Sequence, residues 1–382
     1  MKLVYCIGYL GKPGGTEKVL ANKANYMVDK LGYEVEILIA DQKNHSLYYD
    51  FNPKIKIHDM KISKINNRKT IPVVTFIKNI FKLREIYSKK LNEINPDVIL
   101  VLERGYHDFV IPYINKKIPK IREFHFSLGA VDSKVKILSF IQKVKYKIIY
   151  SFIYKQFPLY DKVVLLTEKD ENEPFYNNVK TTVIPNMIEN FPEDISELNS
   201  QKVISIGSME DDRKGFLKQI EIWRKISINH PKWILNIYGE GKQRKKYIDV
   251  VKQNKLETKI IFHGKSTEIP VKLNESSIFI FTSEAEGLPM VLIEALTNGL
   301  PCVSYDCPTG PSDIISNEED GYIININDEK MFIEKLELLM NNIELRRKLG
   351  DNARKNSIRF LPENVMPLWQ KLFEELISIN LK

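Results

Sequence analysis

Short apolar runs alternate with longer stretches of helical periodicity along most of the chain. In each half the series begins with an apolar run that ends in glycine, residues 3–7 before Gly8 and residues 203–206 before Gly207. Strands that alternate with helices are typical of parallel, doubly wound sheets, so the pattern predicts an α/β chain with two Rossmann-like domains. The other expected strands are residues 34–40, 97–102, 120–124, 162–167, 233–238, 259–262, 277–282, 302–305 and 322–326.

The expected domain boundary lies in a polar stretch that contains prolines, residues 185–201. We therefore expect an N-terminal domain over residues 1–184 and a C-terminal domain over residues 185–361, because one core rarely serves a chain of this length. Residues 362–382 have apolar positions at helical spacing and are expected to form a terminal helix. One place for this helix is against the N-terminal domain.

Composition narrows the class of protein. Of the 382 residues 43% are hydrophobic, and no apolar run reaches the ~18 residues of a membrane span. The first residues lead directly into the first expected strand without the apolar core of a signal peptide, so we expect a cytoplasmic protein. Cys6, Cys302 and Cys307 have no Cys or His partners at zinc-ligand spacing, so no metal site is expected.

Charge is unevenly distributed. Residues 1–183 hold 31 of the 57 Lys and Arg and 19 of the 49 Asp and Glu, which gives a net charge of +12. The remaining residues hold 26 Lys and Arg and 30 Asp and Glu, which gives a net charge of −4. This asymmetry suggests that the first half meets something anionic. Residues 133–157 contain six lysines and no acid, and on a helix Lys136, Lys143 and Lys147 share one stripe. The stretch is either a surface helix packed on the first sheet or a contact with anionic lipid head groups.

Two carboxylates flank the junction of an expected strand and helix. Glu286 follows the strand at residues 277–282, and Glu294 lies inside the helix that Pro289 begins and Gly299 ends. In an open α/β sheet, ligands bind at the carboxyl ends of the strands, with anionic groups toward helix N-termini. The stretch therefore predicts a ligand with hydroxyls and phosphates. Considered alone, two acids at this spacing are more often solvated charges.

These acids carry a resemblance to a known family. The E-x7-E pattern from Glu286 to Glu294 and the sequence after it resemble retaining glycosyltransferases of the GT-B fold, family 4, of the kind that builds bacterial surface polysaccharides. The resemblance covers essentially the whole chain, is strongest over residues 203–324, and implies two Rossmann-like domains that face a cleft. It also implies that Glu294 holds the donor ribose and that Glu286 touches the transferred sugar, with Gly287 and Leu288 beside it. Carboxylates suit both tasks, because they accept hydrogen bonds from diols and stabilise oxocarbenium-like charge.

The loop that begins at Gly207 is expected to hold the donor diphosphate. In the family that the chain resembles, an Arg follows this glycine and a Lys comes later in the loop, and such cations offset charge on the leaving group. Here Ser208 stands in place of the Arg, and the loop is one residue longer. Lys214 matches the lysine. Arg213 either supplies the missing charge from a shifted position or is a solvated loop residue.

Three candidates lie in the first half. Gly14 and Gly15 open the first expected helix, where glycines let a ligand approach the backbone; the alternative is an ordinary tight turn. His125 follows the strand at residues 120–124, and a lone His among apolar neighbours is more often a core residue than a catalyst. The resemblance implies that the glycine loop faces the donor and acceptor and that His125 lies near the transferred sugar.

Glycines also end further strands of the second half. By the resemblance, Gly239 and Gly264 let the backbone read a nucleobase edge, and Gly310 belongs to the same wall of the donor site. Structural turns explain these glycines equally well. Asn186 matches a family asparagine at the hinge between domains, where a structural role is an equal alternative.

These features together predict a retaining glycosyltransferase that moves a hexose or N-acetylhexosamine from a nucleotide sugar, a UDP-sugar by family frequency, to a saccharide or lipid-linked saccharide. The donor would bind the C-terminal domain and the acceptor mainly the N-terminal domain. Glu286, His125 and Lys214 are the expected catalytic residues, and neither a cofactor, a metal nor a nucleic-acid partner is expected. The protein would act in the cytoplasm or, through residues 133–157, at the inner face of the membrane. Two alternatives remain: a nucleotide-sugar epimerase, and a non-catalytic binding protein in which Ser208 marks lost donor activation.

Overall fold

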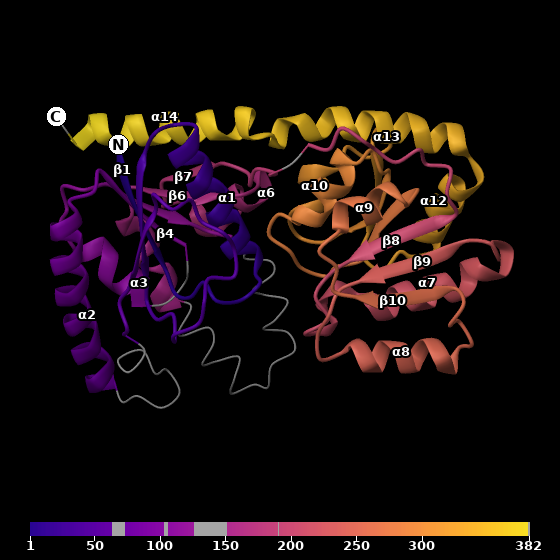
Figure 1. Ribbon diagram of the computed structural model, residues 1–382, viewed down its shortest axis with the longest axis horizontal. Coiled ribbons are helices and arrows are strands. Elements are labelled where there is room, and N and C mark those ends of the chain that lie inside the picture. The colour runs from indigo at the N-terminus through magenta and orange to yellow at the C-terminus, as the bar shows by residue number, and fades with distance from the viewer. Residues whose placement is uncertain (63–72, 103–105, 126–150, 190, 381–382) are drawn as a thin grey trace. The chain divides into compact units, whose positions relative to one another are not determined.

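The computed structural model describes residues 1–62, 73–102, 106–125, 151–189 and 191–380. The chain divides into two compact units (Figure 1). Unit 1 comprises the described residues of Met1–His125, Val135–Met187 and Val365–Lys382, and unit 2 comprises those of Ile188–Asn364. The chain therefore returns to unit 1 at its C-terminal end.

The sheet of unit 1 has seven parallel strands in the order β3-β2-β1-β4-β5-β6-β7. The order reverses at β1, so the carboxyl ends of β1 and β4 flank the topological switch point of a doubly wound sheet, where such folds bind ligands. The strands are β1 (Lys2–Ile7), β2 (Glu34–Ile39), β3 (Lys56–Asp59), β4 (Val98–Val101), β5 (Lys120–Glu123), β6 (Lys162–Leu165) and β7 (Thr181–Val183).

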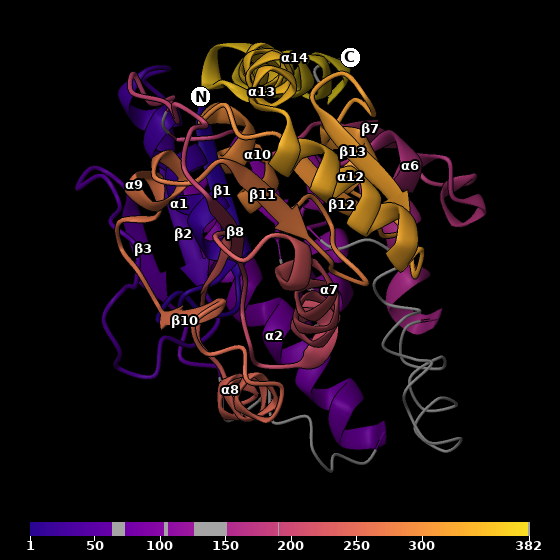
Figure 2. The same cartoon turned by 90° about the vertical axis from the view of Figure 1, so that its right-hand side faces the viewer.

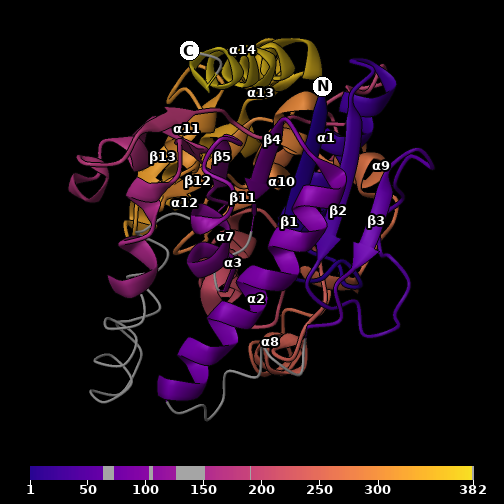
Figure 3. The ribbon, with the colours of Figure 1, turned by 90° about the vertical axis from the view of Figure 1, so that its left-hand side faces the viewer.

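Helices cover both faces of this sheet. On one face, α1 (Gly15–Asp29) and α14 (Pro362–Asn380) share a core with β1, in which Trp369 and Phe373 of α14 lie in the same cluster as Tyr5. Figure 3 looks onto the other face, which carries α2 (Val73–Ile94) and α3 (Tyr106–Val110). The shorter elements are η1 (Ile111–Tyr113), η2 (Phe157–Leu159), α6 (Glu168–Glu171) and η3 (Pro174–Tyr176).

Unit 2 repeats the same winding with six parallel strands in the order β10-β9-β8-β11-β12-β13. Here the order reverses at β8, so the loops after β8 and β11 flank the switch point. The strands are β8 (Lys202–Ile206), β9 (Ile234–Tyr238), β10 (Ile260–Gly264), β11 (Ile278–Phe281), β12 (Cys302–Asp306) and β13 (Gly321–Asn325).

The helices of unit 2 also pack on both faces. The main core gathers Trp223 of α7 (Phe216–Asn229), Tyr247 of α8 (Arg244–Gln253) and Leu336 of α12 (Glu329–Asn341). Figure 2 shows α7 and α12 on one side of the sheet and α10 (Met290–Thr297) on the other. The remaining elements are η4 (Asp212–Lys214), α9 (Ile269–Asn274), α11 (Pro311–Ile314), α13 (Ile343–Ser357) and η5 (Ile358–Phe360). None of the described helices combines the length and apolar character that a membrane span requires.

The predicted fold class, two Rossmann-like parallel sheets, is confirmed. Two strands were not predicted. β3 carries Lys56, His58 and Asp59, and β7 has only three residues; both form edges of their sheet. Edge strands need not be apolar on both faces, so they lack the continuous apolar run that marks an interior parallel strand. Pro289 was expected in the first turn of its helix but precedes α10 as its N-cap, in extended backbone.

Candidate active site

The candidate donor site lies in unit 2 at the carboxyl ends of β8 and β11. The loop after β8 carries Lys214, and the loop after β11 carries Glu286. Lys214 Nζ donates a hydrogen bond of 2.6 Å to Glu286 Oε1, and the two side chains are 15% and 11% exposed. The sheet order therefore brings together the two predicted catalytic residues of the second half at the switch point.

Backbone contacts hold both members of this pair. Thr282, just after β11, donates from Oγ1 to the carbonyl of Lys214 at 3.0 Å. Thr309 donates from Oγ1 to the carbonyl of Glu286 at 2.8 Å. Gly215 follows Lys214 with φ 72°, a left-handed conformation that ends η4 and suits glycine. These contacts fix the backbone at both positions.

Thr282 and Thr309 were not singled out from the sequence. Each acts through its hydroxyl on a carbonyl more than twenty residues away, and no local motif marks such a contact. Thr309 lies next to Gly310 in the segment that was expected to form a wall of the site.

Gly310 has a conformational reason to be glycine. Its φ is 102°, and its N–H donates to Asp313 Oδ2 at 3.0 Å at the start of α11. A Cβ here would lie 2.6 Å from the Gly287 carbonyl oxygen. Gly287 is half-buried and Leu288 is 7% exposed. The segment containing Gly310 therefore packs directly against the loop that carries Glu286.

Glu294 lies in the second turn of α10 and is half-buried. Its carbonyl accepts hydrogen bonds from Thr297 Oγ1 at 2.8 Å and Asn298 Nδ2 at 2.7 Å. Gly299 has φ 70° and follows the end of the helix, as predicted. The second acid of the pattern thus lies in the helix that begins after the Glu286 loop.

The other predicted cation of the β8 loop is less tightly held. Arg213 Nε lies 3.8 Å from Asp211 Oδ1 and has no hydrogen-bond partner among the described residues. Its side chain is 26% exposed. Ser208 is exposed and accepts a hydrogen bond from the Glu210 N–H at 3.4 Å. Arg213 is therefore beside Lys214 in the loop with only a long contact to an acid.

Three predicted glycines end adjacent strands of unit 2. The Gly207 N–H donates to Tyr238 O at 3.0 Å, and the Gly239 N–H donates to Gly264 O at 2.8 Å. Gly239 and Gly264 have φ angles of 147° and 81°. A Cβ on Gly239 would overlap the Gly207 carbonyl, so close backbone packing alone requires this glycine. The sequence had left a structural turn and a ligand contact as equal explanations for these glycines, and a ligand contact stays a prediction.

An aromatic pair beside these glycines was not anticipated. The Tyr238 and His263 rings stack with centroids 4.6 Å apart and planes 9° from parallel. Burial and nearby Lys272 lower the pKa of His263, which favours the neutral ring. His263 Nε2 lies 2.7 Å from Asn236 Oδ1. The stack is a rigid aromatic surface at the carboxyl ends of β9 and β10.

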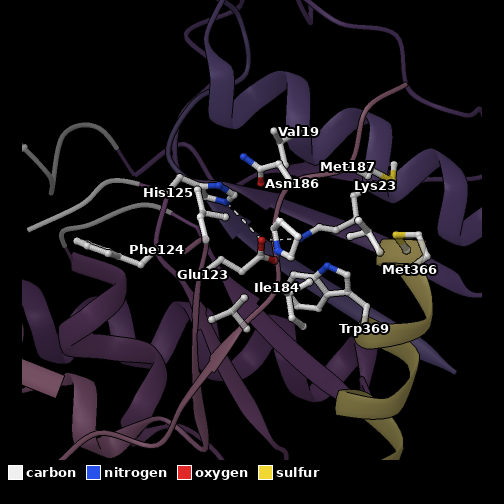
Figure 4. A pocket seen from close by; sticks show the side chains of 14 residues that line it. Val19, Lys23, Glu123, Phe124, His125, Ile184, Asn186, Met187, Met366 and Trp369 are labelled. Atoms are coloured by element: carbon white, nitrogen blue, oxygen red, sulfur yellow. Dashed lines mark hydrogen bonds and ion pairs between the residues drawn. The ribbon is translucent and has the colours of Figure 1, made fainter. Parts of the chain in front are cut away.

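The candidates of unit 1 lie after β1 and β5. Gly14 is the N-cap of α1, and its carbonyl accepts a hydrogen bond from the Lys18 N–H at 3.0 Å. Gly15 is the first residue of that helix. His125 follows β5, and its Nε2 lies 3.3 Å from Glu123 Oε2 (Figure 4). Glu123 also pairs with Lys23 of α1.

Asn186 and His125 line one small pocket of unit 1 (Figure 4). The pocket also includes Lys23, Glu123 and Trp369, none of which had been predicted from the sequence as a site residue. Most of the basic stretch at residues 133–157 lies outside the described residues. Within the described residues no group of three His, Cys, Asp or Glu side chains is arranged to hold a metal ion.

Comparison with known proteins adds to this geometry. Residues 187–356 match the family model described as Glycosyl transferases group 1. An uncharacterized glycosyltransferase of Haemophilus influenzae is 27% identical over 376 residues, which cover 97% of this chain and 99% of that protein. The amylovoran biosynthesis glycosyltransferase AmsD of Erwinia amylovora is 25% identical over 385 residues, with 97% and 99% covered.

A third relative is named for its substrate. It is an α-1,4-N-acetyl-D-galactosaminyltransferase of Campylobacter jejuni whose name includes an undecaprenol-linked saccharide. This relative is 26% identical over 384 residues, which cover 98% of this chain and 99% of that protein. Among solved structures, S. aureus TarM in complex with fondaparinux, α-GlcNAc-glycerol and UDP has a TM-score of 0.77 at 16% identity, covering 98% of this chain and 100% of that chain. That likeness concerns the fold alone. The chain therefore carries a Glycosyl transferases group 1 domain of the GT-B class, and it has glycosyltransferase homologues that match nearly its whole length.

Proposed function

We propose that this protein is a retaining glycosyltransferase of family 4 that uses a nucleoside diphosphate sugar, most simply a UDP-hexose or UDP-N-acetylhexosamine. The observation that carries the proposal is the Lys214–Glu286 pair at the switch point of unit 2. A cation and a carboxylate at this position match the two halves of such a donor, because the diphosphate needs positive charge and the sugar offers hydroxyls.

The proposed roles follow from the positions. Lys214, with Arg213 beside it, binds the diphosphate and offsets the charge that grows on the leaving phosphate. α10 begins at Met290, directly after the Glu286 loop, and its free N–H groups add to that stabilisation. Glu286 accepts hydrogen bonds from the transferred sugar, and Glu294 accepts them from the ribose. These groups supply the charge that a metal provides in other transferases, so we propose a reaction without a metal or cofactor.

In the proposed reaction the bond between the anomeric carbon and the β-phosphate oxygen breaks. A hydroxyl oxygen of the acceptor forms a bond to the same face of the anomeric carbon, and its proton passes to the departing diphosphate. The transition state is oxocarbenium-like, so the Glu286 carboxylate stabilises it electrostatically. No residue is assigned as a covalent nucleophile. His125 of unit 1 is proposed to contact the transferred sugar.

The acceptor is proposed to be a lipid-linked saccharide in the synthesis of a surface polysaccharide. Two homologues support this proposal, since AmsD is named for amylovoran biosynthesis and the C. jejuni enzyme for an undecaprenol-linked substrate. The UDP in the TarM complex supports uracil as the base of the donor. Gly14 and Gly15 at the start of α1 are proposed to lie beside the acceptor.

The decisive experiment measures donor consumption and product formation for UDP-glucose, UDP-galactose and their N-acetylated forms, with and without polyprenyl-diphosphate-linked saccharides. Release of UDP that requires the acceptor supports the transferase. Conversion of the donor to another nucleotide sugar without acceptor would indicate an epimerase instead. Binding without turnover of any donor would indicate a non-catalytic binding protein.

A matched pair of variants locates the chemistry. Glu286→Gln removes the carboxylate that pairs with Lys214. Glu284→Gln, two positions earlier in the chain, removes an exposed carboxylate that pairs with Lys218. We expect the first to lose about 100-fold in kcat or more and the second to keep its activity. Equal activity in both variants would place the site elsewhere.

We also propose that the protein works at the inner face of the cell membrane through residues 133–157. Their six lysines and absent acids favour anionic lipid, at about 1 kcal/mol per lysine near the surface. Phe152, at the described end of the stretch, is 56% exposed. Replacing Lys136, Lys143 and Lys147 with Gln should reduce sedimentation with phosphatidylglycerol vesicles; unchanged sedimentation would remove the membrane contact from the proposal.

A further inference from the structure

A buried charged cluster in unit 1 surrounds the residue expected to touch the sugar. Lys23 of α1 and Glu123 of β5 form an ion pair whose side chains are 4% and 2% exposed. The Lys23 ammonium also lies 3.9 Å from the centroid of the Trp369 ring, which α14 supplies. Figure 4 shows these side chains around the same pocket as His125. Three elements far apart in the sequence, α1, β5 and α14, therefore meet around the Lys23 ammonium.

The stability of the fold does not explain this cluster. Burying an ammonium and a carboxylate costs several kcal/mol of hydration, and apolar replacements of such pairs are often neutral or stabilising. Burial alone would raise the pKa of Glu123, but Lys23 and His125 together lower it, so the carboxylate stays ionised. The pKa of Lys23 is lowered by burial, with Glu123 opposing the shift. The charge on Glu123 is therefore maintained by its two neighbours.

Lys23 and His125 both approach the same oxygen of the Glu123 carboxylate. Glu123 Oε2 accepts from Lys23 Nζ, and His125 Nε2 lies 3.3 Å from the same oxygen. Among the described residues, Glu123 Oε1 and both ring nitrogens of His125 have no hydrogen-bond partner, so Nε2 makes only the 3.3 Å ion-pair contact with Oε2, and the His125 side chain is 6% exposed. A histidine whose Nε2 faces a carboxylate carries its proton there, which leaves the Nδ1 lone pair to accept a hydrogen bond.

We propose that Glu123 is the positioning residue for His125, and that Lys23, held between Glu123 and Trp369, sets how strongly the carboxylate acts on the ring. In this arrangement Nε2–H is directed to Glu123 and Nδ1 is left to accept a hydroxyl hydrogen. That the hydroxyl belongs to a sugar rests on the proposed function. The arrangement of Lys23, Glu123 and His125 does not depend on that function. The C-terminal helix α14 contributes to this arrangement, because its Trp369 packs against the Lys23 ammonium, which competes with His125 for the Glu123 carboxylate.

The first test measures the His125 ring directly by NMR of the full-length protein labelled at histidine Cε1, with His125→Gln to assign the signal among the six histidines. Within the part of the chain that the structure describes, the charged and titratable groups near the ring are Glu123, Lys23 and, next to Lys23, Tyr5. Glu123→Gln removes the anion that faces Nε2, so the midpoint of the ring's titration should be lower in this variant than in the wild type. Lys23→Met removes the competing cation, so the midpoint should rise.

Shifts of opposite sign distinguish positioning from a general loss of structure. Glu123→Asp keeps the charge and should restore a midpoint near the wild-type value. Lys120→Met is the matched control, because it removes a buried ammonium from the same strand, and among the described residues this ammonium donates only to the Asn115 and Ile118 carbonyls. This control should leave the His125 signal unchanged. No shift in Glu123→Gln and Lys23→Met, or the same shift in Lys120→Met, would overturn the proposal.

The second test follows the pH profile of kcat/KM. Glu123→Gln should lower kcat about tenfold or more, move the profile with the NMR midpoint and leave the donor KM unchanged. Trp369→Leu should move the profile partly in the same direction as Lys23→Met. Phe373→Leu, in the same helix and fully buried, should not move it. Opposite NMR shifts without any activity would refute the proposed function alone, whereas normal activity without those shifts would refute the cluster's role alone.

Discussion

Lys214 and Glu286 are separated by 72 positions in the chain, yet their side chains meet at 2.6 Å. Each of the two charges is paired with the other. A diphosphate that enters this site competes with Glu286 for the lysine, and a sugar hydroxyl competes with the lysine for the carboxylate. Donor binding is therefore expected to exchange one internal ion pair for two contacts with the ligand.

The first prediction concerns Lys214. Lys214→Met removes the cation and leaves a poorly exposed carboxylate unpaired, so both donor affinity and turnover should fall, with kcat about 100-fold lower or more. Steady-state kinetics and isothermal titration with UDP measure the two effects. Lys218→Met, which removes a more exposed lysine paired with Glu284, is the control. UDP binding as tight as wild type in Lys214→Met would contradict the assigned role.

The second prediction concerns Gly310. Gly310→Ala forces a side chain into a backbone with φ 102° and brings its Cβ within 2.6 Å of the Gly287 carbonyl. The Glu286 loop must then move, and the backbone strain costs about 1–3 kcal/mol. We expect the melting temperature to fall and UDP affinity to weaken. Ser312→Ala, in the short helix α11 that Gly310 caps, should have little effect, since the Ser312 hydroxyl has no hydrogen-bond partner among the described residues.

The third prediction concerns the thiols. All three cysteines are buried, and burial, followed by Glu286 and Asp306, raises the pKa of Cys307 to about 12. A folded-state pKa above the unfolded value of about 8.5 means that the folded thiol keeps its proton where the unfolded one loses it. The contribution of the Cys307 thiol to the free energy of unfolding is therefore complete below about pH 8.5 and is lost as the pH rises toward 12.

Reaction with a thiol reagent such as DTNB checks this prediction at pH 8. The native protein should react slowly, and the protein in guanidinium should react at all three cysteines. Rapid reaction of the native protein at one thiol would show that the burial of that cysteine is incomplete in solution.

The fourth prediction concerns the core of unit 2. Trp223 of α7 is fully buried, whereas Ile228 in the same helix is 76% exposed. Trp223→Ala should cost about 3–5 kcal/mol of unfolding free energy, because it leaves a cavity in the cluster that supports β8 and β11. Ile228→Ala should change stability by less than about 0.5 kcal/mol. Urea unfolding followed by circular dichroism compares the two variants.

Much of the fold could be predicted because interior parallel strands are apolar on both faces. β1 and β8 were recognisable as short apolar runs that end in glycine. The edge strands β3 and β7 were not, since one is largely polar and the other is only three residues long. The acids of the E-x7-E pattern could be marked from their place at a strand–helix junction. The lysine of the β8 loop was marked only through the resemblance to a family, and the roles of all three residues in the reaction stay predictions.

The sequence by itself determined the alternation of strands and helices and the glycines at strand ends, because these depend on neighbours a few positions away. Only the tertiary structure decided which side chains meet. Strand order placed Lys214 beside Glu286, and the packing of α1 and α14 on one sheet placed Lys23 between Glu123, 100 positions away, and Trp369. Periodicity encodes which face of an element is buried, whereas partners across a sheet follow from the crossovers that set the order of its strands.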